Sequence, residues 1–209
     1  MRRLLLVRHG TTAWVDMHRL HGITDIPLNE NGLRQAREAA EALKSENAQS
    51  LYTSPLQRCR QTAEIIGEAT GLTPKDMAGL KELNFGWLEG RSFRDQSSQN
   101  INFLVKLYDN FTHRVIRALT GESTSSFKQR IMADWNRILQ ENPEGTVIVT
   151  GHSAVFNNLL IHYFGKNFPK GHTYYSMAPG SINEIIIDDQ GKAELVRLND
   201  TAHLSEGKR

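Results

Sequence analysis

The chain has 209 residues, of which 39% are hydrophobic and 23% are charged, and its formal net charge is +2 at pH 7. This size and composition indicate one globular domain over residues 1–209, and the small net charge argues against a nucleic-acid partner. No apolar run approaches the ~20 residues that cross a bilayer, and the N-terminus lacks the apolar core of a signal peptide, so we expect a cytoplasmic protein with no membrane partner.

A short buried strand is predicted at the four apolar residues Leu4–Val7. The run stops at Arg8, His9 and Gly10, which favour an open edge of the fold over its interior. An arginine beside an imidazole, followed by a residue that lets the backbone approach a ligand closely, suits an anionic group and a nucleophile. The tripeptide alone leaves an alternative open, in which Arg8 is a surface charge and His9 a loop residue.

A turn at Asp25–Asn29 leads into the next predicted helix. That helix has apolar residues at helical spacing, namely Leu33, Ala36, Ala40 and Leu43. A second strand is predicted at Ser50–Thr53. Ser54 and Pro55 favour an immediate helix start, as a capping hydroxyl followed by a proline at the first helical position, and Gly71 ends that helix.

The second half of the chain alternates helices and strands after an irregular stretch at residues 76–95. Helices are predicted at residues 100–119, from Ser125 or Ser126 onward, and at residues 154–164. The run Thr146–Thr150 is the strongest strand pattern, and residues 181–187 and 193–198 indicate a hairpin. Strands that alternate with helices predict an α/β fold, with a mainly parallel sheet covered on both faces and an antiparallel edge strand.

Three polar clusters follow predicted strands or lie in the first turns of predicted helices. They are Arg8-His9-Gly10, the pair Arg58 and Arg60, and Gly151-His152-Ser153. Ligands of open α/β sheets bind beyond the carboxyl ends of the strands, so parallel neighbouring strands would bring two histidines and at least one arginine to one crevice. Helix N-termini at this edge would add backbone N–H groups and positive dipole ends, which suit an anion.

The predicted cluster fits a phosphoryl group better than a carboxylate or a metal ion. Guanidinium groups offer paired donors to phosphoryl oxygens and can spread the charge of a transferring phosphoryl group without magnesium. A neutral imidazole can be the nucleophile, and Glu82, among apolar neighbours, can protonate the leaving group. The alternatives are an exposed carboxylate at Glu82 and a hydrogen-bonded strand-end histidine at His152. Glu89 is a rival acid, ranked lower as a loop-stabilising residue, and Arg60 fits a surface role better than a ligand role.

No metal site and no cofactor are predicted. Cys59 is the only cysteine, which excludes an internal disulfide and a cysteine-based metal site. His18 and His21 are three residues apart, but no carboxylate or cysteine accompanies them at a metal-ligand spacing. The expected partner is therefore a small phosphorylated metabolite.

Several motifs, in this order along the chain, resemble those of the histidine phosphatase superfamily, which includes the cofactor-dependent phosphoglycerate mutases and many small phosphatases. They are Leu-Val-Arg8-His9-Gly10-x-Thr12, Gly22–Leu28 followed by Gly32 and Ala36, Tyr52–Ala63, Glu82–Gly90, Gly121-Glu122-Ser123, and Gly151-His152 after an apolar strand. The match covers nearly the whole chain, and the ordered set is very specific although each motif alone is modest evidence.

The resemblance implies a role for each matched residue. His9 would be the phosphorylated nucleophile, and Glu82 would protonate the leaving group and later activate water. The phosphoryl group would be held by Arg8, Arg58 and His152. The pocket would also be lined by Gly10, Thr12, His21, Gly22 and Ser153.

The resemblance further implies a phosphoglycerate mutase-like three-layer α/β/α sandwich with a lid at about residues 91–125. Val15 stands where the family often has a phosphate-binding Asn, and Thr11 stands where Glu or Gln is common. The modest chain length and the short signature Leu83–Gly86 favour a metal-independent phosphatase for small phosphomonoesters. A phosphoglycerate mutase-type activity and a non-catalytic phospholigand-binding protein are the alternatives.

The substrate and the assembly are not fixed by these motifs. The expected lid offers basic and aromatic residues without a recognisable pattern, and phosphosugars, phosphoglycerate-like acids, α-ribazole phosphate and phosphoserine are all candidates. His203 either folds back towards the pocket mouth or makes a simple tail contact. Some relatives suggest a homodimer.

Overall fold

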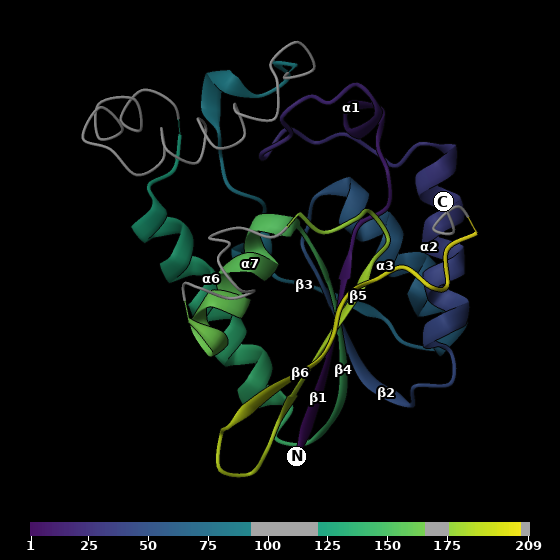
Figure 1. Cartoon of the computed structure of the whole chain (residues 1–209), viewed down its shortest axis with the longest axis vertical. Coiled ribbons are helices and arrows are strands. Elements are labelled where there is room, and N and C mark those ends of the chain that lie inside the picture. Colours follow the sequence, from purple (N-terminus) through teal and green to yellow (C-terminus); the bar gives the residue numbers. More distant parts are fainter. Residues whose placement is uncertain (93–120, 166–175, 206–209) are drawn as a thin grey trace.

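The computed structural model describes residues 1–92, 121–165 and 176–205. In these ranges one six-stranded sheet has the strand order β3-β2-β4-β1-β5-β6 (Figure 1). The strands are β1 (Arg2–Arg8), β2 (Ala48–Thr53), β3 (Pro74–Asp76), β4 (Gly145–Gly151), β5 (Ile182–Ile187) and β6 (Ala193–Asp200). The helices are α1 (Ala13–Asp16), α2 (Glu30–Leu43), α3 (Gln57–Thr70), α6 (Thr124–Glu141) and α7 (Ser153–Phe164), with short 3-10 helices η1 (Ala78–Leu80) and η2 (Gly86–Leu88).

The sheet is mixed, and its parallel part contains the strands that lead into the candidate site. β1 pairs with β4, β4 with β2, and β2 with β3, all in parallel. The hairpin β5–β6 adds the antiparallel pairings, first with β1 and then within itself. The α/β prediction is therefore confirmed, and the reversed strand is β5, one position in from the edge.

The apolar run of β1 explains why the sheet is covered on both faces. Successive side chains of a strand point to opposite faces. Leu4 and Leu6 pack in the cluster that includes α6 and α7, whereas Leu5 and Val7 pack in the cluster that includes α2 and α3. Figure 1 shows these two helix pairs on opposite sides of the sheet, which confirms the three-layer prediction.

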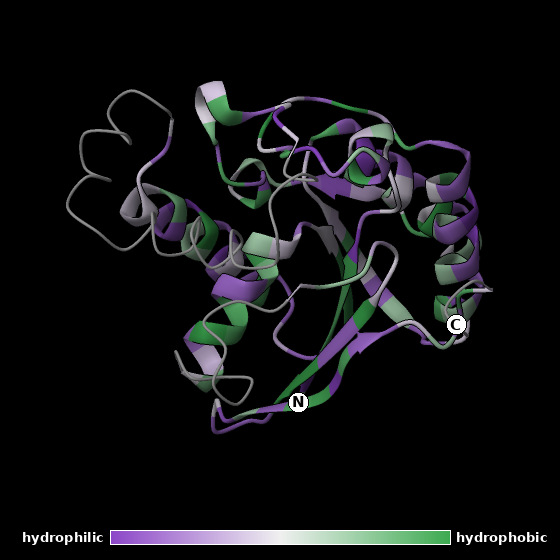
Figure 2. Ribbon diagram, turned by 45° about the horizontal axis from the view of Figure 1, so that its top comes forward, coloured by the Kyte–Doolittle hydropathy of each residue, from purple (hydrophilic) through white to green (hydrophobic). Residues whose placement is uncertain are grey.

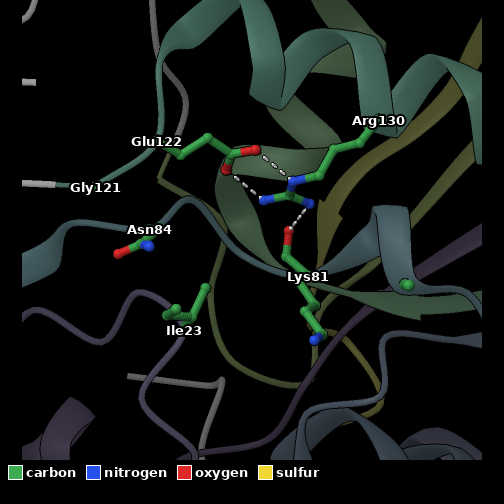
Figure 3. Close-up of a pocket in the computed structure, with 7 residues that line it drawn as sticks. Ile23, Lys81, Asn84, Gly121, Glu122 and Arg130 are labelled. Atoms are coloured by element: carbon green, nitrogen blue, oxygen red, sulfur yellow. Dashed lines mark hydrogen bonds and ion pairs between the residues drawn. The ribbon is translucent and has the colours of Figure 1, made fainter. Parts of the chain in front are cut away.

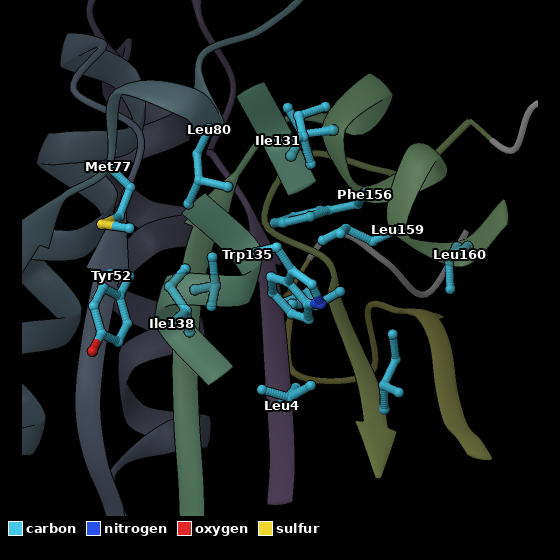
Figure 4. Packing of buried hydrophobic residues seen from close by; sticks show 14 of the residues in the cluster. Leu4, Tyr52, Met77, Leu80, Ile131, Trp135, Ile138, Phe156, Leu159 and Leu160 are labelled. Carbon is cyan, nitrogen blue, oxygen red and sulfur yellow. The ribbon is translucent and has the colours of Figure 1, made fainter. Parts of the chain in front are cut away.

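The larger of the two core clusters lies under α6. The predicted apolar stripe of α6 is buried and consists of Phe127, Ile131, Trp135 and Ile138. Figure 4 shows Trp135 beside Phe156 of α7 and above Leu4 of β1. The indole Nε1 of Trp135 donates to the Tyr163 hydroxyl at 2.8 Å, so the one polar atom of this ring is satisfied within the core. Hydrophilic and hydrophobic residues alternate along the helices in Figure 2, as one buried face per helix requires.

One predicted helix start is wrong. α3 begins at Gln57 and not at Ser54-Pro55, because the backbone of Leu56 is still extended, with φ −70° and ψ 137°. The Ser54 hydroxyl points to another partner described below, and the Asp25 carboxylate accepts the hydrogen bond from the Gln57 amide at 2.7 Å instead. The end of α3 is as predicted, with Gly71 in the left-handed conformation at φ 73°.

Two predictions lie mainly or wholly outside the described residues. The helix expected at 100–119 is one of them, and most of the lid expected at 91–125 is the other. Among the helices that are described, none is long and apolar enough to cross a membrane.

Candidate active site

The parallel register brings the ends of three strands to one edge of the sheet. Arg8 pairs with Gly151, and Thr53 pairs with Thr150, so the residues that follow these strands start side by side. The backbone amide of His9 donates to the Gly151 carbonyl at 3.1 Å. The imidazole rings of His9 and His152 consequently lie 5.2 Å apart, centre to centre, in an edge-to-face arrangement.

The His9 ring is oriented by its own backbone. Its Nδ1 lies 2.7 Å from the Gly10 carbonyl oxygen. A carbonyl only accepts hydrogen bonds, so Nδ1 carries the proton and Nε2 keeps a lone pair. Burial lowers the pKa of His9 well below its usual value, and the guanidinium groups of Arg58 and Arg8 lower it further. His9 is therefore a neutral imidazole that keeps a nucleophilic lone pair on Nε2.

Arg58 is a buried cation with one hydrogen-bond donor that the described residues do not use. It is fully buried in the first turn of α3, and it donates from Nη1 to the Thr24 carbonyl at 2.9 Å and from Nη2 to the Gly22 carbonyl at 2.7 Å. Its Nε has no hydrogen-bond partner in the part of the chain that the structure describes. A buried guanidinium with an unused N–H suits an anionic ligand, because such a donor is costly to leave without a partner.

Arg8 supplies a second positive charge from the end of β1. Its side chain is partly buried, and Nη1 donates to the Met177 carbonyl. After burial and the charge of Arg58, the positive charge of Arg8 also lowers the pKa of both His9 and His152. Arg8 and Arg58 thus both disfavour a protonated imidazole at these two positions.

His152 is fully buried at the N-terminal end of α7. Its Nε2 lies 2.9 Å from the Ser54 hydroxyl and 3.4 Å from the sulfur of Cys59. Burial and the charge of Arg58 lower the pKa of His152. Ser54 is a site residue that the sequence did not reveal, because its pattern was interpreted as a helix cap.

Glu82 reaches the same helix end from the loop after η1. It is 9% exposed, its Oε1 accepts from the Leu83 amide at 2.8 Å, and its Oε2 lies 3.4 Å from the Ala154 amide in the first turn of α7. Burial raises the pKa of Glu82 above the ordinary value of a carboxyl group. The alternative of an exposed carboxylate is therefore wrong, and a buried acid lies at the N-terminal end of α7.

His21 and Thr12 form a pair at the side of the site. The Thr12 hydroxyl is hydrogen bonded to His21 Nε2 and accepts from the Val15 amide at 3.3 Å. The ring of His21 lies 6.3 Å from that of His9, centre to centre. Burial, with a smaller contribution from Arg58, lowers the pKa of His21 to about 4. This third imidazole is therefore neutral near pH 7.

The two glycines of the predicted pocket are needed for packing inside the protein. A Cβ on Gly10 would lie 2.4 Å from the Gly32 carbonyl oxygen, and the Gly10 amide donates to Thr62 at 3.3 Å. The lack of a side chain at Gly10 is thus required by its packing on the start of α2, and its approach to a ligand stays a prediction. Gly22 has φ +56°, and a Cβ there would collide with Glu89.

The residues ranked lower from the sequence lie where a structural role would put them. Glu89 accepts from the backbone amides of Ile23, Thr24 and Phe85 at 2.8–3.0 Å, so it stabilises loops.

Arg60 forms an ion pair with Asp76 at the sheet edge. His203 Nε2 lies 3.0 Å from the Gly180 carbonyl, which is a tail contact. Within the described residues, no three His, Cys, Asp or Glu side chains gather in a metal-binding group.

A family model for the histidine phosphatase superfamily, branch 1, matches residues 4–201 of the chain. The uncharacterized phosphatase PhoE of Bacillus subtilis is 33% identical over 165 residues, which are 79% of each protein. A protein of Yersinia pestis named "Probable phosphoglycerate mutase GpmB" is 29% identical over 98% of this chain and 95% of its own length.

A solved structure extends the similarity to three dimensions. The crystal structure of a phosphoserine phosphatase mutant from Entamoeba histolytica, in complex with phosphoserine, superposes with a TM-score of 0.75 and 27% identity. The alignment covers 98% of this chain and all of that one. The relatives thus include proteins named as phosphatases and proteins named as mutases.

Proposed function

The chain belongs to the histidine phosphatase superfamily, and we propose that it is a phosphatase that hydrolyses small phosphomonoesters through a phosphohistidine on His9. One observation carries the proposal. His9 is buried and neutral, its Nδ1–H is held by the Gly10 carbonyl, and its Nε2 is left as the nucleophile beside a buried arginine that has a spare donor.

In the first step, the lone pair of His9 Nε2 attacks the phosphorus atom and the bond from phosphorus to the ester oxygen breaks. Arg8, Arg58 and His152 hold the phosphoryl oxygens, and the first N–H groups of α7 add a positive dipole end. The departing alkoxide takes a proton from the Glu82 carboxyl group. Burial of that carboxyl favours the protonated form that this step requires.

In the second step, a water molecule replaces the alcohol. The Glu82 carboxylate takes a proton from this water, the water oxygen attacks phosphorus, and the phosphorus–Nε2 bond breaks. Inorganic phosphate leaves, His9 is again neutral and Glu82 is again protonated. The same carboxyl group therefore acts as acid and then as base, and no further reactant is needed.

The charge of the transferring group is balanced by fixed side chains in this mechanism. Two guanidinium groups and a helix N-terminus supply the positive charge that phosphoryl transfer needs. We therefore expect turnover to be unchanged by a chelator of divalent cations. A loss of turnover on chelation that a divalent ion restores would contradict the mechanism.

A panel of phosphorylated metabolites, with nitrophenyl phosphate as a general substrate, tests the activity. We expect hydrolysis by the wild-type chain and at least a ~10⁴-fold lower kcat in His9→Ala, because the attacking atom is gone. The exposed His162 offers the matched control, and His162→Ala should keep full activity. Equal turnover in His9→Ala and wild type would contradict the proposal.

A mutase is the second candidate, and it rests on the Yersinia relative that aligns over 98% of this chain. A mutase must keep its phosphohistidine from water and pass the phosphoryl group to another hydroxyl. Stable transfer activity stimulated by 2,3-bisphosphoglycerate would support it. Release of inorganic phosphate as the main product would support the phosphatase.

A further inference from the structure

Arg130 of α6 has hydrogen-bond acceptors for all five of its N–H groups. Its Nε and Nη2 donate to the two carboxylate oxygens of Glu122, each at 2.7 Å. Its remaining contacts are to backbone carbonyls, from Nη1 to Gly79 at 2.7 Å and Lys81 at 2.6 Å, and from Nη2 to Glu82 at 2.9 Å. Figure 3 shows the fork on Glu122 and the contact with Lys81, in the wall of a cavity of about 390 Å³.

The three carbonyls belong to the segment that carries the proposed acid. Gly79 lies in η1, and Glu82 lies two residues beyond the end of η1 at Leu80, in a stretch without regular structure. Gly79 also packs tightly on α6, because a Cβ there would lie 2.3 Å from the Arg130 carbonyl oxygen. Arg130 and Glu122 therefore fasten this loop to a long, well-packed helix. We name the two side chains together the Glu122–Arg130 clamp.

The Glu82 carboxyl group has little else to hold it. Its oxygens accept from the backbone amides of Leu83, its own neighbour, and Ala154, at 2.8 and 3.4 Å. No hydrogen bond from another side chain to this carboxyl group is present in the described residues. Its distance from the leaving group is therefore set by the position of its backbone.

We infer that Glu122 and Arg130 are positioning residues that hold the backbone of Glu82, so that its carboxyl group reaches the leaving-group oxygen. The inference rests on the proposed function, and it assigns a task to the Gly121-Glu122-Ser123 motif and to an arginine outside every motif. Neither residue touches the phosphoryl group in this scheme. The clamp acts only on proton transfer and leaves the phosphoryl-binding half of the site intact.

The inference predicts a loss that depends on the leaving group. An alkyl phosphate needs its departing oxygen protonated, whereas nitrophenolate leaves without help. Lysine at position 130 keeps the charge but cannot form the fork or reach three carbonyls, because its ammonium is a compact charge with three donors. We expect Arg130→Lys to lower kcat on an alkyl phosphate by about 10-fold or more, and on nitrophenyl phosphate by less than about 3-fold.

The experiment measures kcat for a series of phosphomonoesters of rising leaving-group pKa. The wild type, Arg130→Lys, Glu122→Gln and Glu82→Gln are compared. The expected result is a steeper dependence on leaving-group pKa in both clamp variants, in the direction of Glu82→Gln. In the double variant Glu82→Gln/Arg130→Lys, the second change should add little on alkyl phosphates.

The matched control is Arg137→Lys, on the same helix, where the arginine is exposed and, within the described residues, forms an ion pair only with Glu141. It should leave the dependence unchanged. Equal losses on all esters in both clamp variants, or a lower melting temperature with an unchanged slope, would overturn the inference while the phosphatase stands. A wild-type chain without turnover or phosphohistidine would instead overturn the proposed function. Glu122→Gln keeps the test decisive if Arg130→Lys does not fold.

Discussion

The two halves of the candidate site are built in different ways. His9 and His152 follow directly from parallel strands, and backbone hydrogen bonds between those strands fix their separation. Glu82 stands in a loop with only two three-residue 3-10 helices near it, and that loop is held by the side chains of Arg130 and Glu89. The nucleophile half thus inherits its precision from the sheet, whereas the acid half depends on a few polar side chains.

After the loss of His9 itself, the largest effect is expected at Arg58, also in the nucleophile half. Lysine in its place cannot donate to both the Gly22 and Thr24 carbonyls and to a phosphoryl oxygen, so the charge at the phosphoryl group becomes displaced. We expect Arg58→Lys to lower kcat/KM by about 10²–10³-fold on every ester. Steady-state kinetics check this, together with weaker inhibition by inorganic phosphate. A loss confined to alkyl phosphates would contradict the division of the site.

The next largest effect concerns the acid half and is expected in the pH dependence of activity. His9 must be neutral to attack, and its pKa is lowered, so the rising limb of kcat/KM lies on the acid side. Glu82 must be protonated, and burial raises its pKa, so activity on alkyl phosphates falls as pH rises through that value. Glu82→Gln should remove this falling limb and lower kcat on alkyl phosphates about 10²-fold. A falling limb that persists in the variant would belong to another group.

The same division explains what the sequence could predict. The apolar runs Leu4–Val7 and Thr146–Thr150 mark buried strands. When two such strands pair in parallel, the polar residues that follow them come together, independently of the conformations of the connecting loops. Arg130 carried no such signal. Its backbone partners lie 48 to 51 residues away. Every residue type has a backbone carbonyl group, so the sequence does not show which carbonyls accept these hydrogen bonds. Only the resemblance singled out Glu122.

Ser54 shows the converse limit. A hydroxyl before a proline fits the rule for a helix start, and that rule is local. In the fold, the Ser54 hydroxyl is hydrogen bonded to His152, 98 residues away. The Asp25 carboxylate accepts the hydrogen bond from the Gln57 amide in its place. The Ser54 hydroxyl therefore makes a tertiary contact that the local sequence pattern does not predict.

Glu89 allows the two halves to be perturbed from one residue. Its carboxylate accepts from Ile23, Thr24 and Phe85, so it ties the loop that orients Arg58 to the loop that follows Glu82. An amide at this position has one acceptor oxygen and turns an NH₂ group towards donors. We expect Glu89→Gln to lower kcat/KM about 10-fold on nitrophenyl phosphate and by more on alkyl phosphates, whereas Arg130→Lys should largely spare nitrophenyl phosphate. A loss confined to alkyl phosphates would show that Glu89 acts on the acid half alone.

The smallest effect on chemistry is expected at Gly10, where the sheet half depends on backbone packing. A methyl group there would meet the Gly32 carbonyl at 2.4 Å. We expect Gly10→Ala to lower the free energy of unfolding by about 1–3 kcal/mol, as overpacking does, and to shift the nucleophile loop slightly. Denaturant unfolding measures the loss. An unchanged stability would mean that the loop and α2 separate without cost.

The orientation of the His9 ring is the central claim, and the position of the trapped phosphoryl group tests it most directly. Labelled phosphomonoester is mixed with the protein, the reaction is quenched in alkali, and the phosphorylated nitrogen is identified by phosphorus NMR of the peptide. Because Nδ1–H is held by the Gly10 carbonyl, the label should be found on Nε2 of His9. Label on Nδ1, on another residue, or in equal amount in His9→Ala would contradict the account.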